Sequence, residues 1–96
     1  MNIGNVIKEL RKQNGHNQKT FASLCGITPT SLSLIESGAK KPSPRTIKEI
    51  CRVLNIKESV LYILSLEKDD VPESKREIFD TMFPHIKSML FDISKE

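Results

Sequence analysis

The stretch that decides the fold of this 96-residue chain is Gln18–Ser37, which reads QKTFASLCGITPTSLSLIES. Two short helical patterns lie on either side of Gly26, a residue that can adopt the positive φ needed in a tight turn. Asn17 precedes the first pattern and is a favourable N-cap residue. Thr28 followed by Pro29 is typical of an N-cap and the first residue of a helix. The stretch therefore predicts two helices joined by a short turn.

The spacing of small and apolar residues within this stretch is typical of a helix-turn-helix. Counted from Gln18, the small residue Ala22 stands at position five, where two crossing helices approach most closely, and Gly26 stands at nine, in the turn. The apolar positions four, eight, ten, fifteen and eighteen hold Phe21, Cys25, Ile27, Leu32 and Ile35. Gly38 follows as a C-terminal capping residue, so the second helix is expected to end near Ser37.

Apolar residues at three- and four-residue spacing predict further helices on both sides of this motif. One helix of about ten residues precedes it and ends near Gly15. Two more follow, one beginning at Pro44 after the N-cap Ser43 and one over about 57–66. No segment alternates as a strand would, so we expect an all-α domain of five helices over residues 1–66.

The chain beyond residue 66 predicts a linker and a C-terminal helical extension. Residues 67–73 are polar, and a sixth helix is expected over about 73–93. Pro84 stands inside this helix and predicts a kink or break near Met82–Phe83. The apolar stripe of the extension consists of Phe79, Met82, Phe83, Ile86, Met89, Leu90 and Ile93.

Composition and charge narrow the class of function. Residues 1–66 carry ten Lys/Arg against four Asp/Glu, and residues 67–96 carry five against eight, so a basic body precedes an acidic tail. Cys25 and Cys51 are too few for a disulfide framework and are expected to be buried thiols. The chain shows no secretory signal, no apolar run long enough to span a membrane, and no catalytic, metal-binding or cofactor-binding motif. We expect a cytoplasmic protein that is not an enzyme and needs no metal or cofactor.

Over residues 3–66 the sequence resembles the lambda-repressor-like, or Cro/XRE, family of helix-turn-helix proteins. The resemblance implies a compact five-helix DNA-binding domain in a bacterial or phage-encoded regulator of transcription. It also implies a homodimer on a palindromic operator, with half-sites about 34 Å apart. The residues that carry it are Asn17–Gln18, Ala22, Gly26–Ile27, Ile35–Glu36 with Gly38, Pro42–Ser43 and Leu54–Asn55–Ile56.

The second helix of the motif is expected to lie in the major groove and contact bases. Its outward residues offer hydroxyl groups and one leucine, which can contact a thymine methyl. The face lacks Gln, Asn and Arg, so shape and bridging water are expected to contribute to specificity. The base-contacting candidates are Pro29, Thr30, Ser33 and Leu34. The phosphate-contacting candidates are Asn17, Gln18, Lys19, Ser37, Lys40, Lys41 and Arg45.

Arg11 and Glu36 occupy positions at which members of this family commonly form an ion pair. The resemblance therefore implies a structural pair that couples the first helix to the recognition helix. A carboxylate aimed at DNA would be repelled by phosphates, which also favours a structural role for Glu36.

Two roles are open for residues 67–96. The extension, together with the fifth helix, can join two copies of the chain. Alternatively, it can bind a protein partner, as in an antitoxin that neutralises a toxin and represses its own operon. An ordered tail favours the first and a disordered tail the second. The dimerisation candidates are Leu61, Phe79, Met82, Phe83, Ile86, Met89 and Leu90.

Overall fold

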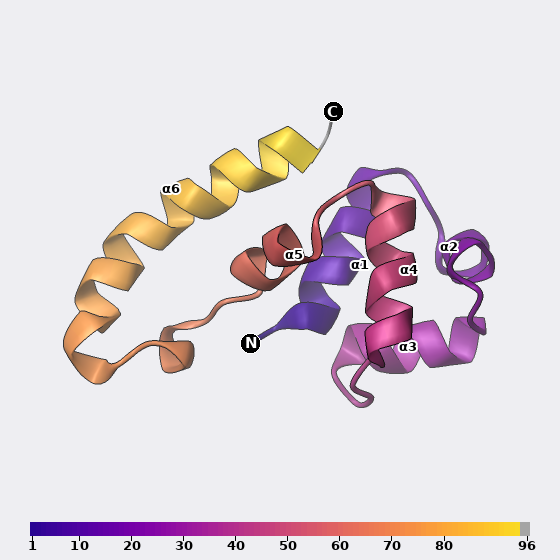
Figure 1. Ribbon diagram of the computed structural model, residues 1–96, viewed down its shortest axis with the longest axis horizontal. Helices are drawn as coiled ribbons and strands as arrows, with labels where there is room; N and C mark the ends of the chain where they lie inside the picture. The colour runs from indigo at the N-terminus through magenta and orange to yellow at the C-terminus, as the bar shows by residue number, and fades with distance from the viewer. Residues whose placement is uncertain (95–96) are drawn as a thin grey trace.

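The structure, a computed structural model, describes residues 1–94, with side chains through residue 92. Over this range the chain forms α-helices and two short 3-10 helices, with no strand (Figure 1). The first five helices are α1 (Ile3–Gln13), α2 (Gln18–Cys25), α3 (Pro29–Ser37), α4 (Pro44–Leu54) and α5 (Glu58–Leu64). The all-α class predicted from the sequence is confirmed.

The capping residues identified in the sequence begin the helices of the motif. Asn17 Oδ1 accepts a hydrogen bond from the Thr20 amide at 2.8 Å, and Thr28 Oγ1 accepts one from the Ser31 amide at 3.0 Å. Gly26, with φ 73°, ends α2 in the left-handed conformation that glycine adopts without strain. These local contacts fix where α2 stops and α3 starts, and so set the turn between them.

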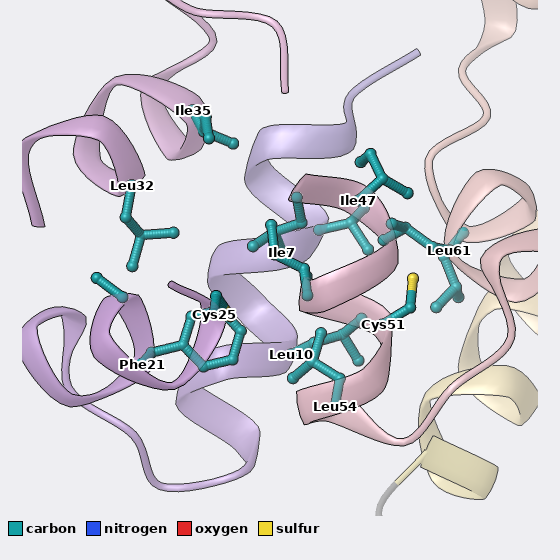
Figure 2. Close-up of a cluster of buried hydrophobic side chains, with 14 residues drawn as sticks. Ile7, Leu10, Phe21, Cys25, Leu32, Ile35, Ile47, Cys51, Leu54 and Leu61 are labelled. Carbon is teal, nitrogen blue, oxygen red and sulfur yellow. The ribbon is translucent and has the colours of Figure 1, made fainter. Parts of the chain in front are cut away.

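The hydrophobic core is built around α1, which contacts α3, α4 and α5 (Figure 2). Ile7 and Leu10 of α1 are fully buried at its centre, and Phe21 of α2 and Leu32 of α3 close it from the other side. The core therefore fixes α2 and α3, the two helices of the motif, in one orientation relative to α1. Its buried apolar residues are Val6, Ile7, Leu10, Phe21, Ala22, Cys25, Leu32, Ile35, Ile47, Ile50, Cys51, Leu54, Leu61 and Leu64.

An especially close approach between helices lies where α1 crosses α3. A Cβ atom added to Gly4 would collide with the backbone carbonyl of Ile35 and would press on that of Glu36. Glycine at position 4 thus lets the start of α1 rest directly on the backbone of α3.

A C-terminal arm follows α5. It contains the 3-10 helices η1 (Lys68–Asp70) and η2 (Glu73–Lys75) and the long helix α6 (Arg76–Ser94). The break considered near Pro84 does not occur, since α6 continues through this residue and curves along its length (Figure 1). Proline removes one backbone hydrogen bond, and curvature relieves the crowding of its ring against the preceding turn.

Contacts near the start of α6 join it to η1 within the arm, and contacts near its end join it to the domain. Near its start, Lys68 Nζ lies 3.2 Å from Asp80 Oδ2, and Arg76 Nε donates to the Lys68 carbonyl. Near its end, Leu90 and Phe91 pack against the core cluster, and Gln13 Nε2 of α1 donates to the Phe91 carbonyl at 2.9 Å. The side chain of Ile93, part of the predicted stripe, lies outside the described residues.

None of the helices in residues 1–94 combines the length and apolar character required to cross a membrane.

Candidate nucleic-acid interface

The outward face of α3 carries the four residues predicted to contact bases. All four side chains are exposed, and Leu34 retains 42% of its accessible surface although it is apolar. The opposite face of α3 is anchored by Leu32 and Ile35, which are almost completely buried. An α-helix with one face fixed in the core and the other exposed is the element that a major groove admits. The exposed set is Pro29, Thr30, Ser33 and Leu34.

Most of the predicted phosphate contacts are exposed around this face. Lys19, Lys41 and Arg45 are exposed, and among the described residues their side chains form no hydrogen bond or ion pair. Lys40 behaves differently, because its Nζ donates to Ser31 Oγ of α3 at 3.0 Å. Cationic groups thus extend from the start of α2 to the start of α4.

Two further candidates take part in local hydrogen bonds. Ser37 Oγ donates to the Leu34 carbonyl at 3.0 Å and accepts from the Ala39 amide at 3.4 Å, so it helps to end α3. Asn17 is used as the N-cap of α2. Both residues remain exposed, so these bonds leave their polar groups near solvent.

A buried ion pair locks α3 to α1. Arg11 Nε lies 2.7 Å from Glu36 Oε2, and Arg11 Nη2 donates to Glu36 Oε1 at 3.1 Å. Arg11 Nη1 donates to the carbonyl of His16, just before α2. Both side chains are more than nine-tenths buried, where a bidentate pair with further hydrogen bonds is favourable and a broken pair is costly. The pair implied by the family resemblance therefore forms, and the bonds of Arg11 reach from α1 to α3 and to His16, two residues before α2.

Gln18 belongs to this network, which the sequence did not predict. Its Nε2 donates to Glu36 Oε1 at 2.9 Å, so the side chain expected to meet a phosphate is directed at the end of α3. Each carboxylate oxygen of Glu36 is thereby engaged, Oε1 by two donors. The backbone amides at the start of α2 keep the capacity to meet a phosphate.

Arg52 is a second residue that sequence reasoning missed. Its Nη2 donates to the Leu24 carbonyl at the end of α2 at 3.0 Å, and its Nε contacts Glu49 at 2.8 Å. Arg45 and Arg52 also line a polar cavity of about 470 Å³ between the α2–α3 turn and α4. A basic residue on α4 that bonds a carbonyl in the last turn of α2 favours the geometry of the turn.

The two cysteines have no reactive character. Burial raises the pKa of Cys25 and of Cys51 to about 11, so both are neutral thiols near pH 7. Both belong to the hydrophobic core, as expected from the sequence.

One predicted interface residue is wrong. Leu61 of α5 has no exposed surface, because it belongs to the core formed by α1, α4 and α5, so its side chain is not available to a second molecule. The large apolar residues of α5 that are exposed are Tyr62 and Ile63, 38% and 40% accessible.

The comparisons with known proteins agree with this geometry. The helix-turn-helix family profile matches residues 7–61, more than half of the chain. The chain belongs to this family, in its Cro/XRE branch, and is a DNA-binding regulator of transcription.

Three relatives illustrate the range of the family. The ImmF control region 10 kDa protein of Bacillus phage phi105 is 32% identical over 65 residues, 68% of this chain and 72% of that protein. The uncharacterized HTH-type transcriptional regulator YazB of Bacillus subtilis (strain 168) is 40% identical over 53 residues, 55% of this chain and 77% of that protein. Antitoxin PezA of Streptococcus pneumoniae serotype 4 is 41% identical over 54 residues, 56% of this chain but only 34% of that protein. No solved structure matches the chain significantly.

Proposed function

We propose that this protein is a repressor that binds a palindromic operator as a homodimer, with α3 of each copy in the major groove. The observation that carries the proposal is that the outward face of α3 is exposed while the helix itself is bonded to both neighbouring helices. Glu36, at the end of α3, is bonded to α1 through a buried ion pair and to the start of α2 through Gln18. A helix held in this way presents its outward side chains in one orientation, as base recognition requires.

The reading surface is built from short hydroxyls and one apolar side chain. Thr30 and Ser33 can donate to or accept from base edges, and Leu34 suits a thymine methyl group. Short hydroxyls discriminate bases less strongly than bidentate amide or guanidinium groups. We therefore propose an operator whose shape supplies part of the specificity.

The test compares operator binding with binding to unrelated DNA. A selection from random DNA first identifies the site, its symmetry and its half-site spacing. The double variant Thr30→Ala/Ser33→Ala is then expected to lose about 10- to 100-fold in specific affinity, since a single hydroxyl contact contributes less than the roughly 1–3 kcal/mol of a bidentate base contact. Affinity for unrelated DNA is expected to stay within about twofold, because the phosphate contacts are retained.

A matched control removes two hydroxyls far from α3. Ser59→Ala/Ser88→Ala, in α5 and α6, changes two exposed serines and is expected to leave both affinities unchanged. Intact specific binding by the Thr30/Ser33 variant would show that this face does not read the operator.

A second candidate function is that of an antitoxin, which also binds a protein partner through residues 67–96. The similarity to antitoxin PezA supports it. Against it, α6 is ordered and docked on its own domain, and an ordered arm favours self-association. Recovery of a stable complex between the full chain and the product of a neighbouring gene would favour this second candidate.

A further inference from the structure

Helix α6 carries an apolar stripe that its own domain leaves uncovered. Ile78, Met82 and Met89 keep 56%, 55% and 55% of their accessible surface, and Ile86 keeps 39%. Their spacings of four, four and three residues place them on one face of the helix. We call these four residues the α6 stripe.

A different face of the same helix is already used within the chain. Phe79 and Phe83 are half-buried and stack with ring centroids 4.5 Å apart, and Leu90 and Phe91 pack against the core. The α6 stripe therefore remains exposed while α6 is docked, rather than because α6 is detached. Four neighbouring side chains of this size are more than the isolated apolar residues normal on a surface.

We propose that the α6 stripe is the homodimer interface and that two copies pair through it with their α6 helices antiparallel. The proposal deepens the proposed function, because it rests on the homodimer and names the surface that forms it.

The order of residues along α6 favours an antiparallel second copy as the occupant. A two-fold axis near Pro84 places Ile78 opposite Met89 of the second copy and Met82 opposite its Ile86. Every branched isoleucine then faces a flexible methionine, which adapts its shape to fill gaps. A parallel pair would place isoleucine against isoleucine and methionine against methionine.

The position of α6 leaves the recognition helix free. α1 and α5 lie between α6 and α3, so that a second copy on α6 does not cover the reading face (Figure 1). A standard interface buries about 800 Å² on each partner, and the exposed Tyr62 and Ile63 of α5 offer further apolar surface beyond the stripe.

The first test introduces charge into the stripe of the full chain. Met82→Glu/Ile86→Glu is expected to raise the dimer dissociation constant at least 10-fold, measured by sedimentation equilibrium. The control Thr81→Glu/Ser88→Glu adds the same charge at exposed positions of α6 outside the stripe and is expected to remain dimeric. Both variants should keep the wild-type circular dichroism, because all four positions are exposed.

The second test determines the direction of pairing by disulfide formation. Ile78→Cys alone and Met89→Cys alone are expected to give no cross-linked dimer, whereas an oxidised mixture of the two gives a covalent heterodimer. The native cysteines should not interfere, because both are buried. Cross-linking of either single variant with itself would overturn the antiparallel arrangement, and failure of the mixture to cross-link would overturn the interface.

Failure of the proposed dimer interface can be distinguished from failure of the proposed DNA-binding function. The Met82→Glu/Ile86→Glu variant is expected to bind a single half-site as well as the wild type does, while losing its tighter binding to the full palindrome. A wild-type chain that stays monomeric at millimolar concentration, or a stripe variant that stays fully dimeric, overturns the inference even if operator binding is confirmed. Loss of all operator binding by the wild type would instead overturn the proposed function.

Discussion

At the scale of single residues, the position of α3 depends on the small size of one glycine. Gly4 allows α1 to lie against the backbone of Ile35, inside the space that a Cβ atom would occupy. Backbone atoms cannot move aside as the end of a long side chain can, so any larger residue must separate α1 from α3. Close packing in protein interiors makes such separations costly.

Gly4→Ala is therefore expected to lower the free energy of unfolding by about 2–3 kcal/mol, although alanine favours helices more than glycine does. Urea denaturation of the variant measures the loss. Lys8→Ala, at an exposed site on the same helix, is the control and should change stability by less than about 0.5 kcal/mol. A Gly4→Ala protein more stable than the wild type would contradict the close contact.

Gln18 gives the second prediction at this scale. Gln18→Ala removes one of the two donors to Glu36 Oε1, and hydrogen bonds to charged groups contribute about 1.5–3 kcal/mol. Because the Gln18 side chain is only partly buried, we expect a loss of about 1–2 kcal/mol in stability and a lower ratio of specific to non-specific DNA affinity. Thr20→Ala, an exposed change in the same helix, is the control. Unchanged stability together with equal loss of affinity for every DNA would instead indicate a direct phosphate contact.

At the scale of elements, α6 is held to the domain by the last turns that the structure describes. Phe91 packs on the core, and its carbonyl accepts the bond from Gln13 of α1. The middle of α6 is less covered by the domain, as its exposed residues show. The end of the helix is therefore one point at which the arm is attached to the domain.

Phe91→Ala is expected to release the end of α6, because it removes a large part-buried side chain from the attachment site. Amide hydrogen exchange should then become at least 10-fold faster in α6, while the core amides of α1 and α4 remain protected. Met89→Ala lies on the exposed stripe and should leave exchange in the monomer unchanged. Equal exchange rates in the Phe91 variant and the wild type would show that the arm is held elsewhere.

The elements themselves could be predicted from the sequence because their signals are local. Asn17, Thr28 and Gly26 act on neighbours within three or four residues, so their roles follow from order alone. The roles of Gly4, Gln18 and Arg52 depend on which helix surfaces meet, and no short-range pattern specifies that. The prediction for Leu61 is wrong for a related reason, since an apolar stripe does not say which of its members the core covers.

At the scale of the whole molecule, charge is divided between two regions. The basic residues around α3 form one pole, whereas the acidic arm lies on the other side of α1 and α5 (Figure 1). The salt dependence of DNA binding should therefore come from the lysines and arginines of the helical domain, since each phosphate neutralised releases a counterion.

Lys40→Ala/Lys41→Ala is expected to weaken binding to every DNA sequence. The slope of log affinity against log salt should fall by about 1–2, close to one for each phosphate that is no longer neutralised. Fluorescence anisotropy over a salt series gives the slope. Lys57→Ala/Lys75→Ala removes the same charge from exposed positions away from α3 and should leave the slope nearly unchanged. Identical slopes for both variants would assign the electrostatic contribution to net charge rather than to position.

The bond from Gln13 to Phe91 also bears on how the protein is made. α1 is synthesised before every helix that it contacts, yet Asn2 bonds to Ser65, Arg11 to Glu36 and Gln13 to Phe91. These hydrogen bonds of the first residues cannot form until residues 25, 63 and 78 positions further along the chain have been synthesised. The apolar face of α1 therefore stays exposed, and prone to aggregation, until α3 and then α5 have been synthesised. The last of these bonds forms only after the end of α6 has been synthesised.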